Sequence, residues 1–151
     1  MKTEIRRAQT ADAEIVYELT KELMAYHKAL DIFTTTCERF KEMIDKRELY
    51  SFIAYDDGQP IGVMNFFFKI TTFTGKKILY IEDLFVREAS RRKSVGRLLV
   101  DKARKIAKEL DCEEIELKCA EWNTKSAAFY ENNNFTNDTN WKIFTLNNTK
   151  F

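Results

Sequence analysis

Residues 78–119 alternate between strand and helix patterns, and this alternation constrains the fold more than any other feature of the chain. Residues 78–86 form an apolar, β-rich run, and in residues 113–119 apolar positions alternate with charged ones. Both patterns are typical of strands. The segment between them, residues 96–110, carries apolar side chains at helical spacing: Leu99, Ala103, Ile106 and Leu110. A strand, a helix and a second strand in this order predict a βαβ-like unit.

The rest of the chain predicts further strands and helices, with antiparallel hairpins before the βαβ-like unit. The turn at residues 56–59 joins two β-rich runs, as a hairpin turn does. The predicted elements are, in order, strand 4–8, a helix after Thr10, a helix from near Thr35, strands 50–55, 60–70 and 78–86, helix 96–110, strand 113–119, helix 126–132 and strand 141–146. This order predicts a mixed α/β sandwich, with helices flanking the sheet.

Composition excludes several classes of function. The 151 residues contain no Gly/Ser linker and no repeat, which favours one domain over residues 1–151. With 25 Lys and Arg against 24 Asp and Glu, the net charge of +1 argues against a nucleic-acid-binding protein. The apolar runs are too short to cross a membrane, and no secretory signal follows Met1, so a cytoplasmic protein is expected. One histidine and three cysteines without a C-x-x-C pair predict no metal site.

The segment after the strand 78–86 has the pattern of an anion-binding site. Residues 91–93 are Arg-Arg-Lys, and the helix begins at Gly96. A helix N-terminus offers unpaired backbone N–H groups and the positive end of its dipole, and basic side chains add charge-assisted hydrogen bonds to phosphate. The alternative interpretation is a solvated basic loop. The segment lacks the glycine patterns of nucleotide-binding loops.

Two further residues are candidates for proton transfer. Glu82 lies in an apolar strand between Ile81 and Leu84, where a carboxyl group can act as a base. Its alternative interpretation is an ordinary surface acid at a strand end. Tyr130 follows Phe129 on the short helix 126–132 and can donate a proton; alternatively, both rings are core anchors of that helix.

Taken together, these segments resemble the GCN5-related N-acetyltransferase (GNAT) superfamily. Arg91, Ser94 and Gly96 are similar to its Q/R-x-x-G-x-G/A coenzyme A motif. Residues 79–86 (LYIEDLFV) and 120–123 (AEWN), the latter followed by Ser126, Phe129 and Tyr130, are similar to motifs of the diamine subfamily, the spermidine/spermine and thialysine N-acetyltransferases. The resemblance covers essentially the whole chain. It implies a mixed, mostly antiparallel sheet, splayed between two central strands.

The resemblance also implies roles for individual residues. Glu82 would take the proton of the acceptor amine and Tyr130 would protonate the departing thiolate. Tyr26, His27, Glu82 and Asp83 would contact a small polyamine, diamine or thialysine-like substrate. Acetyl-CoA, with no metal, would be the co-substrate. Its binding residues would be Leu84, Phe85, Val86, Arg91, Arg92, Lys93, Ser94, Val95, Gly96, Arg97, Asn123 and Ser126. Members of the subfamily commonly form homodimers, so a homodimer is expected.

One position departs from the superfamily motif: Ser94 replaces its first glycine. A serine in left-handed backbone geometry costs about 1–2 kcal/mol relative to glycine. Two alternative functions remain open at this stage. One is the same chemistry on a protein N-terminus or lysine side chain. The other, motivated by Ser94, is a non-catalytic coenzyme A-binding module.

Overall fold

The computed structural model describes residues 2–151, with the side chains of Arg92 and Lys93 left out. The chain divides into two compact units, each described by itself. The first unit ends at Lys118, and the second unit runs from Cys119 to Phe151.

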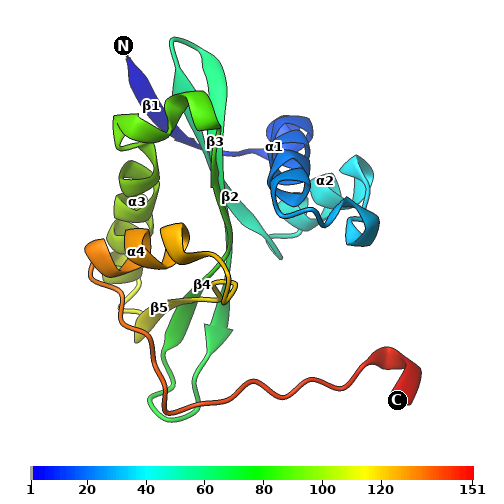
Figure 1. The fold of residues 1–151 in the computed structure, drawn as a ribbon, viewed down its shortest axis with the longest axis vertical. Coiled ribbons are helices and arrows are strands. Elements are labelled where there is room, and N and C mark those ends of the chain that lie inside the picture. Colours follow the sequence, from blue (N-terminus) through cyan, green and yellow to red (C-terminus); the bar gives the residue numbers. More distant parts are fainter. Residues whose placement is uncertain (1) are drawn as a thin grey trace. The chain divides into compact units, whose positions relative to one another are not determined.

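A five-stranded sheet forms the centre of the first unit, in the order β1-β2-β3-β4-β5 (Figure 1). Neighbouring strands from β1 to β4 are antiparallel, whereas β5 pairs parallel with β4. This arrangement confirms the predicted mixed, mostly antiparallel sheet. The strands are β1 (Thr3–Arg7), β2 (Tyr50–Asp56), β3 (Gln59–Ile70), β4 (Lys77–Val86) and β5 (Glu114–Leu117).

Three α-helices of the first unit lie where the sequence predicts helices: α1 (Ala13–Tyr26), α2 (Cys37–Asp45) and α3 (Val95–Glu109). A short 3-10 helix, η1 (Thr10–Asp12), precedes α1, so α1 begins three residues after Thr10. The N-cap of α2 is Thr36 rather than Thr35, because the Thr36 hydroxyl accepts the N–H of Arg39 at 3.1 Å.

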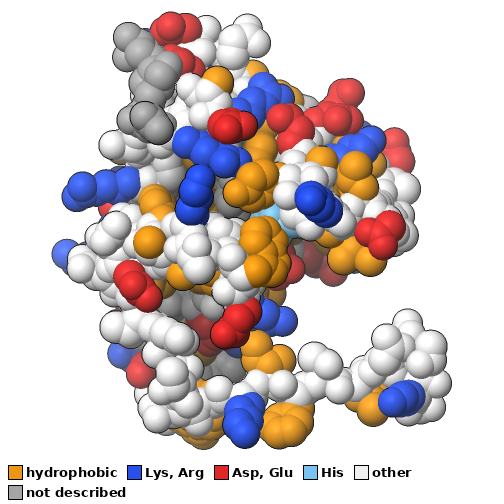
Figure 2. Space-filling view, viewed as in Figure 1, with side chains coloured by type: hydrophobic (Ala, Val, Ile, Leu, Met, Phe, Trp, Pro, Cys, Tyr) orange, Lys and Arg blue, Asp and Glu red, His pale blue; other side chains and the backbone are white. Residues whose placement is uncertain are grey.

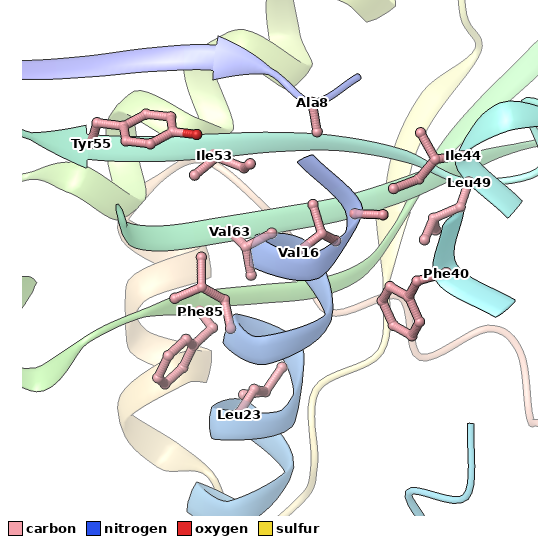
Figure 3. Close-up of a cluster of buried hydrophobic side chains, with 12 residues drawn as sticks. Ala8, Val16, Leu23, Phe40, Ile44, Leu49, Ile53, Tyr55, Val63 and Phe85 are labelled. Carbon is pink, nitrogen blue, oxygen red and sulfur yellow. The ribbon is translucent and has the colours of Figure 1, made fainter. Parts of the chain in front are cut away.

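Two apolar clusters lie on opposite faces of this sheet. The first packs α1 and α2 against β2, β3 and β4, with Val16 of α1 among Ile53, Val63 and Phe85 of the strands (Figure 3). The second packs Leu99 and other α3 residues against the opposite face. Because side chains alternate along a strand, β2 and β3 each supply both clusters. The helices therefore cover the two faces separately.

A β-bulge interrupts the ladder between β3 and β4. Asn65 pairs with Asp83, but the next residue, Phe66, pairs with Ile81, so Glu82 is an extra residue on β4. Because of the extra residue, the odd-numbered side chains of β4 point to one face of the sheet before the bulge and to the other face after it. Ile81 belongs to the cluster under α3, whereas Phe85 belongs to the cluster under α1. The acidic pair thus lies where β4 changes faces.

The second unit contains one α-helix, α4 (Thr124–Asn132), and a long tail. The chain leaves the helix through Asn134, which has the left-handed φ of 69° that asparagine tolerates. The predicted strand at residues 141–146 is absent: the segment is irregular up to the short 3-10 helix η4 (Asn148–Lys150). A strand needs a neighbour for its backbone hydrogen bonds, and among residues 2–151 this segment has none. Its apolar side chains stay exposed, Trp141 at 69% and Phe144 at 90%. Hydrophobic side chains can be seen on the surface of this tail in Figure 2.

Candidate active site

The ladder between the two parallel strands of the first unit, β4 and β5, ends at the bulge. Their ladder runs from Ile78 opposite Glu114 to Ile81 opposite Leu117 and ends there. Beyond Glu82, residues 83–86 of β4 pair with β3 on one side and have no ladder partner on the β5 side within the described residues. Leu84, Phe85 and Val86, expected to hold the coenzyme, lie on this open stretch. This end of the parallel pairing agrees with the predicted splaying of two central strands.

The acidic pair places two carboxyl groups in different surroundings. Glu82, at the bulge, is exposed, whereas Asp83 is half-buried. The amide of Asn65 donates a hydrogen bond from Nδ2 to Oδ2 of Asp83 at 2.9 Å. Burial raises the pKa of Asp83 to about 6; the nearby Glu82 charge adds to the rise, and the Asn65 amide opposes it. At neutral pH most of the Asp83 carboxyl groups are ionised and can attract a cation.

Arg91 connects the end of β4 to the end of α1. Its Nε donates to the carbonyl oxygen of Val86 at 2.8 Å. Its guanidinium lies over the ring of Tyr26, with Cζ 4.7 Å from the ring centroid. The half-buried His27 follows Tyr26, and their two rings are 5.6 Å apart. The structure thus brings Tyr26 and Arg91, predicted for the acceptor and the coenzyme, to the same end of β4.

The turn before α3 has the left-handed geometry expected at the superfamily's glycine position. Ser94 lies at φ 60° and ψ 20°, between the 3-10 helix η3 (Glu88–Lys93) and α3. The basic segment between β4 and α3 is therefore partly helical. The first hydrogen bond within α3 runs from the N–H of Leu98 to the carbonyl oxygen of Ser94. The amides of residues 95–97 belong to the first turn of α3, where N–H groups have no carbonyl partner inside their own helix.

This first turn of α3 suits an anion. Over the described residues, no side chain caps the turn and no acidic residue lies in it. Val95 is buried, Gly96 is half-buried and Arg97 is exposed. Arg92 and Lys93 were also expected to bind the coenzyme, but their side chains lie outside the described part of the chain.

Arg87 is a structural residue of the site that the sequence reasoning missed. Its guanidinium donates to both carboxylate oxygens of Glu22, at 2.9 and 2.7 Å, and to the carbonyl oxygen of Pro60 at 2.8 Å. These bonds join the end of β4 to α1 and to the start of β3. No local pattern could reveal the pair, because Glu22 and Arg87 are 65 residues apart in the chain.

The other candidate residues, Asn123, Ser126 and Tyr130, belong to the second unit. The side chain of Asn123 accepts the N–H of Ser126 at 3.1 Å, so Asn123 is the N-cap of α4. The sequence reasoning did not assign this capping role. The half-buried ring of Tyr130 makes edge contacts with Phe129 and Phe135, with centroids 5.4 and 5.6 Å apart.

The described residues were compared with the requirements of a metal site and of a membrane-spanning helix. No group of three or more His, Cys, Asp or Glu side chains there is arranged to hold a metal ion. No helix among them is long and apolar enough to cross a membrane.

A mixed sheet whose parallel ladder ends at a bulge, followed by a left-handed turn and a helix, defines an acetyltransferase-like fold in the first unit. The model of the Acetyltransferase (GNAT) family matches residues 14–135, in both units. The protein therefore belongs to the GNAT family of N-acetyltransferases, which confirms the resemblance seen in the motifs.

Similar proteins agree with this assignment. The chain is 26% identical to a thialysine N-epsilon-acetyltransferase of Caenorhabditis elegans over 137 residues, 89% of this chain and 85% of that protein. It is 26% identical to the spermidine/spermine N(1)-acetyltransferase-like protein 1 of Homo sapiens, over 95% of this chain and 22% of that protein. A solved structure described as a probable acetyltransferase matches with a TM-score of 0.83 at 19% identity, covering 95% of this chain and 97% of that one.

Proposed function

We propose that this protein transfers the acetyl group of acetyl-CoA directly to a primary amine of a small polyamine, diamine or thialysine-like substrate. We propose further that residues 1–151 act as one N-acetyltransferase domain. The observation that carries the proposal is the acidic pair at the bulge, where the open stretch of β4 begins. The thialysine and spermidine/spermine names of two relatives support the substrate class.

Residues of the first unit support the proposed binding of acetyl-CoA. The first-turn amides of residues 95–97 would hold the pyrophosphate, with Arg91 and the neighbouring basic residues adding positive charge. The open backbone of residues 84–86 would bind the pantetheine arm, because extended backbone without a ladder partner offers hydrogen-bonding groups. Asn123 and Ser126 would lie beside the coenzyme. When bound, acetyl-CoA supplies the acetyl group as a thioester.

The acidic pair, Glu82 and Asp83, would bind the protonated amine and remove its proton. A primary alkylamine has a pKa near 10.4, so it arrives as a cation and must lose a proton before it can attack. Glu82 and Asp83 would attract this cation, together with Tyr26 and His27. The exposed Glu82 carboxylate would then take the proton, directly or through water. A backbone N–H at the bulge would stabilise negative charge on the thioester oxygen.

Tyr130 would supply the second proton transfer. Its phenol would protonate the coenzyme thiolate as it departs, since a phenol keeps its proton at neutral pH. No covalent intermediate with the protein is needed, so none of the three cysteines takes part. The protein would act in the cytoplasm as a homodimer, and sedimentation at micromolar concentration tests the dimer directly: a monomer mass would contradict it.

The decisive experiment is an acceptor screen with the purified protein and acetyl-CoA. Thialysine, spermidine, ornithine and a lysine-containing peptide serve as acceptors, with thiol release and product mass as readouts. We expect acetylation of a small amine, and a strong loss of that activity in Glu82→Gln. Acetylation of the peptide alone would select a protein acetyltransferase. Coenzyme binding without transfer to any amine would select the non-catalytic alternative.

A further inference from the structure

A row of polar residues crosses three strands on the sheet face that α1 covers. Ser51 of β2 pairs with Asn65 of β3, which pairs with Asp83 of β4. Ser51 and Asn65 are almost fully buried, at 1% and 0% exposure. The next row of paired residues on the same face is entirely apolar: Ile53, Val63 and Phe85. The fold can therefore fill this face with apolar side chains. The row of Ser51, Asn65 and Asp83 is polar although the neighbouring row is apolar.

Hydrogen bonds determine the orientation of the Asn65 amide. The Ser51 hydroxyl donates to Oδ1 of Asn65 at 2.6 Å. Nδ2 of Asn65 donates to the Thr20 hydroxyl of α1 at 2.8 Å and to Oδ2 of Asp83 at 2.9 Å. Thr20 uses its own proton for the carbonyl oxygen of Val16, at 2.7 Å. A flipped amide would put its oxygen against the Asp83 carboxylate, so only the observed orientation satisfies every group.

Asp83 is the one member of this hydrogen-bond network that keeps an oxygen without a hydrogen bond among the described residues. Thr20 and Ser51 are buried and their protons are committed inside the network. Oδ2 of Asp83 accepts from Asn65, and among the described residues no hydrogen bond reaches Oδ1. A buried amide is costly unless its partners satisfy it, and removing one partner leaves the others unpaired. The three buried side chains therefore hold Asp83 by one oxygen and leave its other oxygen available.

We propose that Asn65, oriented by Thr20 and Ser51, is a positioning residue for the acceptor amine: it holds Oδ2 of Asp83 within the sheet so that Oδ1 can bind the cationic substrate. This inference rests on the proposed function, and it adds residues of α1, β2 and β3 to a site otherwise built on β4. Asn65 does not touch the amine in this proposal. It acts through the Asp83 carboxyl group.

The electrostatics of Asp83 support this role. The Asn65 amide lowers the pKa of Asp83, against the rise caused by burial and by the neighbouring Glu82. The network groups that face Asp83 from α1, β2 and β3 are neutral, and Glu82 on its own strand is the charged group that acts on it. Loss of the Asn65 amide would therefore raise the pKa further and leave fewer Asp83 groups charged at neutral pH.

A double-mutant cycle tests the proposal. Asn65→Val has a similar size and suits a strand, but it cannot donate to Asp83. In the wild-type background we expect it to lower kcat/KM for the amine by about tenfold or more, the scale of a hydrogen bond to a charged group. In an Asp83→Asn background the same change should cost less than about twofold, because the group it positions has lost its charge. Equal losses in both backgrounds would overturn the proposal.

Two further variants separate positioning from stability. Thr20→Val keeps the shape of the side chain and removes one partner of Asn65, so it should raise KM for the amine and leave KM for acetyl-CoA unchanged. Ile53→Val, on the neighbouring apolar row, is the matched control: it should lower the melting temperature without changing KM for the amine. If Asn65→Val does not fold, Thr20→Val decides, and equal KM changes in Thr20→Val and Ile53→Val would reject the positioning role.

A measurement without turnover keeps this inference separate from the proposed function. NMR titration of the Asp83 carboxyl group should show a higher pKa in Thr20→Val or Asn65→Val than in the wild type, and no change in Ile53→Val. An unchanged pKa in both network variants would overturn the positioning role even in an active enzyme. Failure of the wild type to acetylate any amine would instead overturn the proposed function, whatever the titration shows.

Discussion

Gly62 of β3 lies so close to β4 that a Cβ atom placed on it would be 2.9 Å from the carbonyl oxygen of Phe85. The same atom would be 3.3 Å from Cγ2 of Val86. These contacts fall at the end of the open stretch of β4, which is expected to hold the coenzyme. The absence of a side chain at residue 62 therefore lets β3 support this stretch.

Gly62→Ala should disturb both the fold and the coenzyme site. Because backbone has to move to admit the new methyl group, we expect a loss of about 1–3 kcal/mol in the free energy of unfolding and weaker binding of acetyl-CoA. Urea denaturation and calorimetric titration measure the two effects. Gly75→Ala is the control: it has open space but a φ of 72°, so it should lower stability while leaving coenzyme affinity unchanged. Unchanged affinity in Gly62→Ala would separate this contact from the site.

Ser94→Gly should stabilise the protein. Serine is strained at a φ of 60°, whereas glycine adopts this geometry freely, so the variant should gain about 1 kcal/mol of unfolding free energy. Acetyl-CoA affinity should be kept or become tighter. Ser90→Gly, a nearby buried serine outside the positive-φ residues, is the control and should lose stability. A large loss of affinity in Ser94→Gly would show instead that the Ser94 hydroxyl contacts phosphate.

Asp83 should make stability depend on pH. Its pKa is about 6 in the folded protein and about 3.9 in the unfolded chain, so folding favours the protonated form. The stabilisation is complete below about pH 4 and is lost as the pH rises through 6, by about 3 kcal/mol in total. Asp83→Asn removes this dependence and should therefore gain stability relative to the wild type as the pH rises.

Urea denaturation from pH 4 to pH 8 checks this expectation. Asp31→Asn, which removes an exposed carboxyl group, is the control and should follow the wild-type curve. If the curves of Asp83→Asn and the wild type stay parallel over this range, the assignment of the raised pKa to Asp83 is wrong.

Glu82→Gln should affect the amine more than the coenzyme. The change keeps the shape of the side chain but removes the charge that attracts the cation and the group that takes its proton. We expect a large fall in kcat/KM for the amine, partly restored at high pH, where the amine loses its proton unaided. Steady-state kinetics over a pH series tests this, with KM for acetyl-CoA as the internal control. Unchanged amine kinetics would leave Glu82 a structural residue of the bulge.

Tyr130→Phe should lower kcat and leave the fold intact. It removes the hydroxyl proposed to protonate the thiolate, so we expect a fall of about 10²–10⁴-fold. The ring keeps its contacts with Phe129 and Phe135, so the melting temperature and acetyl-CoA affinity should hardly change. Phe135→Leu is the control for packing and should lower stability. Full activity with lower stability in Tyr130→Phe would make the ring a core anchor alone.

Local sequence patterns predict most of the elements, because they record preferences of short segments. The apolar spacing of residues 96–110 predicts α3 to within one residue at each end, and the turn at Asp57 and Gly58 adopts the positive φ angles of a hairpin. The motif around Ser94 predicts left-handed geometry at that residue. The resemblance in residues 79–86 and 120–123 predicts the family, which the family comparison confirms.

Tertiary structure decides what depends on partners distant in the chain. The bulge at Glu82 arises from pairing with β3, and it decides that Asp83 faces Asn65, 18 residues away. The hydrogen bonds between Arg87 and Glu22 join the end of β4 to α1, although the two residues are 65 positions apart in the chain.

The tail shows that a local preference for a strand is not sufficient to form one. Residues 141–146 have the composition of a strand, but no ladder partner is present among the described residues, so the segment stays irregular. A sequence by itself thus determines which segments favour a helix, a strand or a left-handed turn. Only the tertiary structure decides which of them meet, because hydrogen bonds and burial are shared between segments and local preference does not encode the partner.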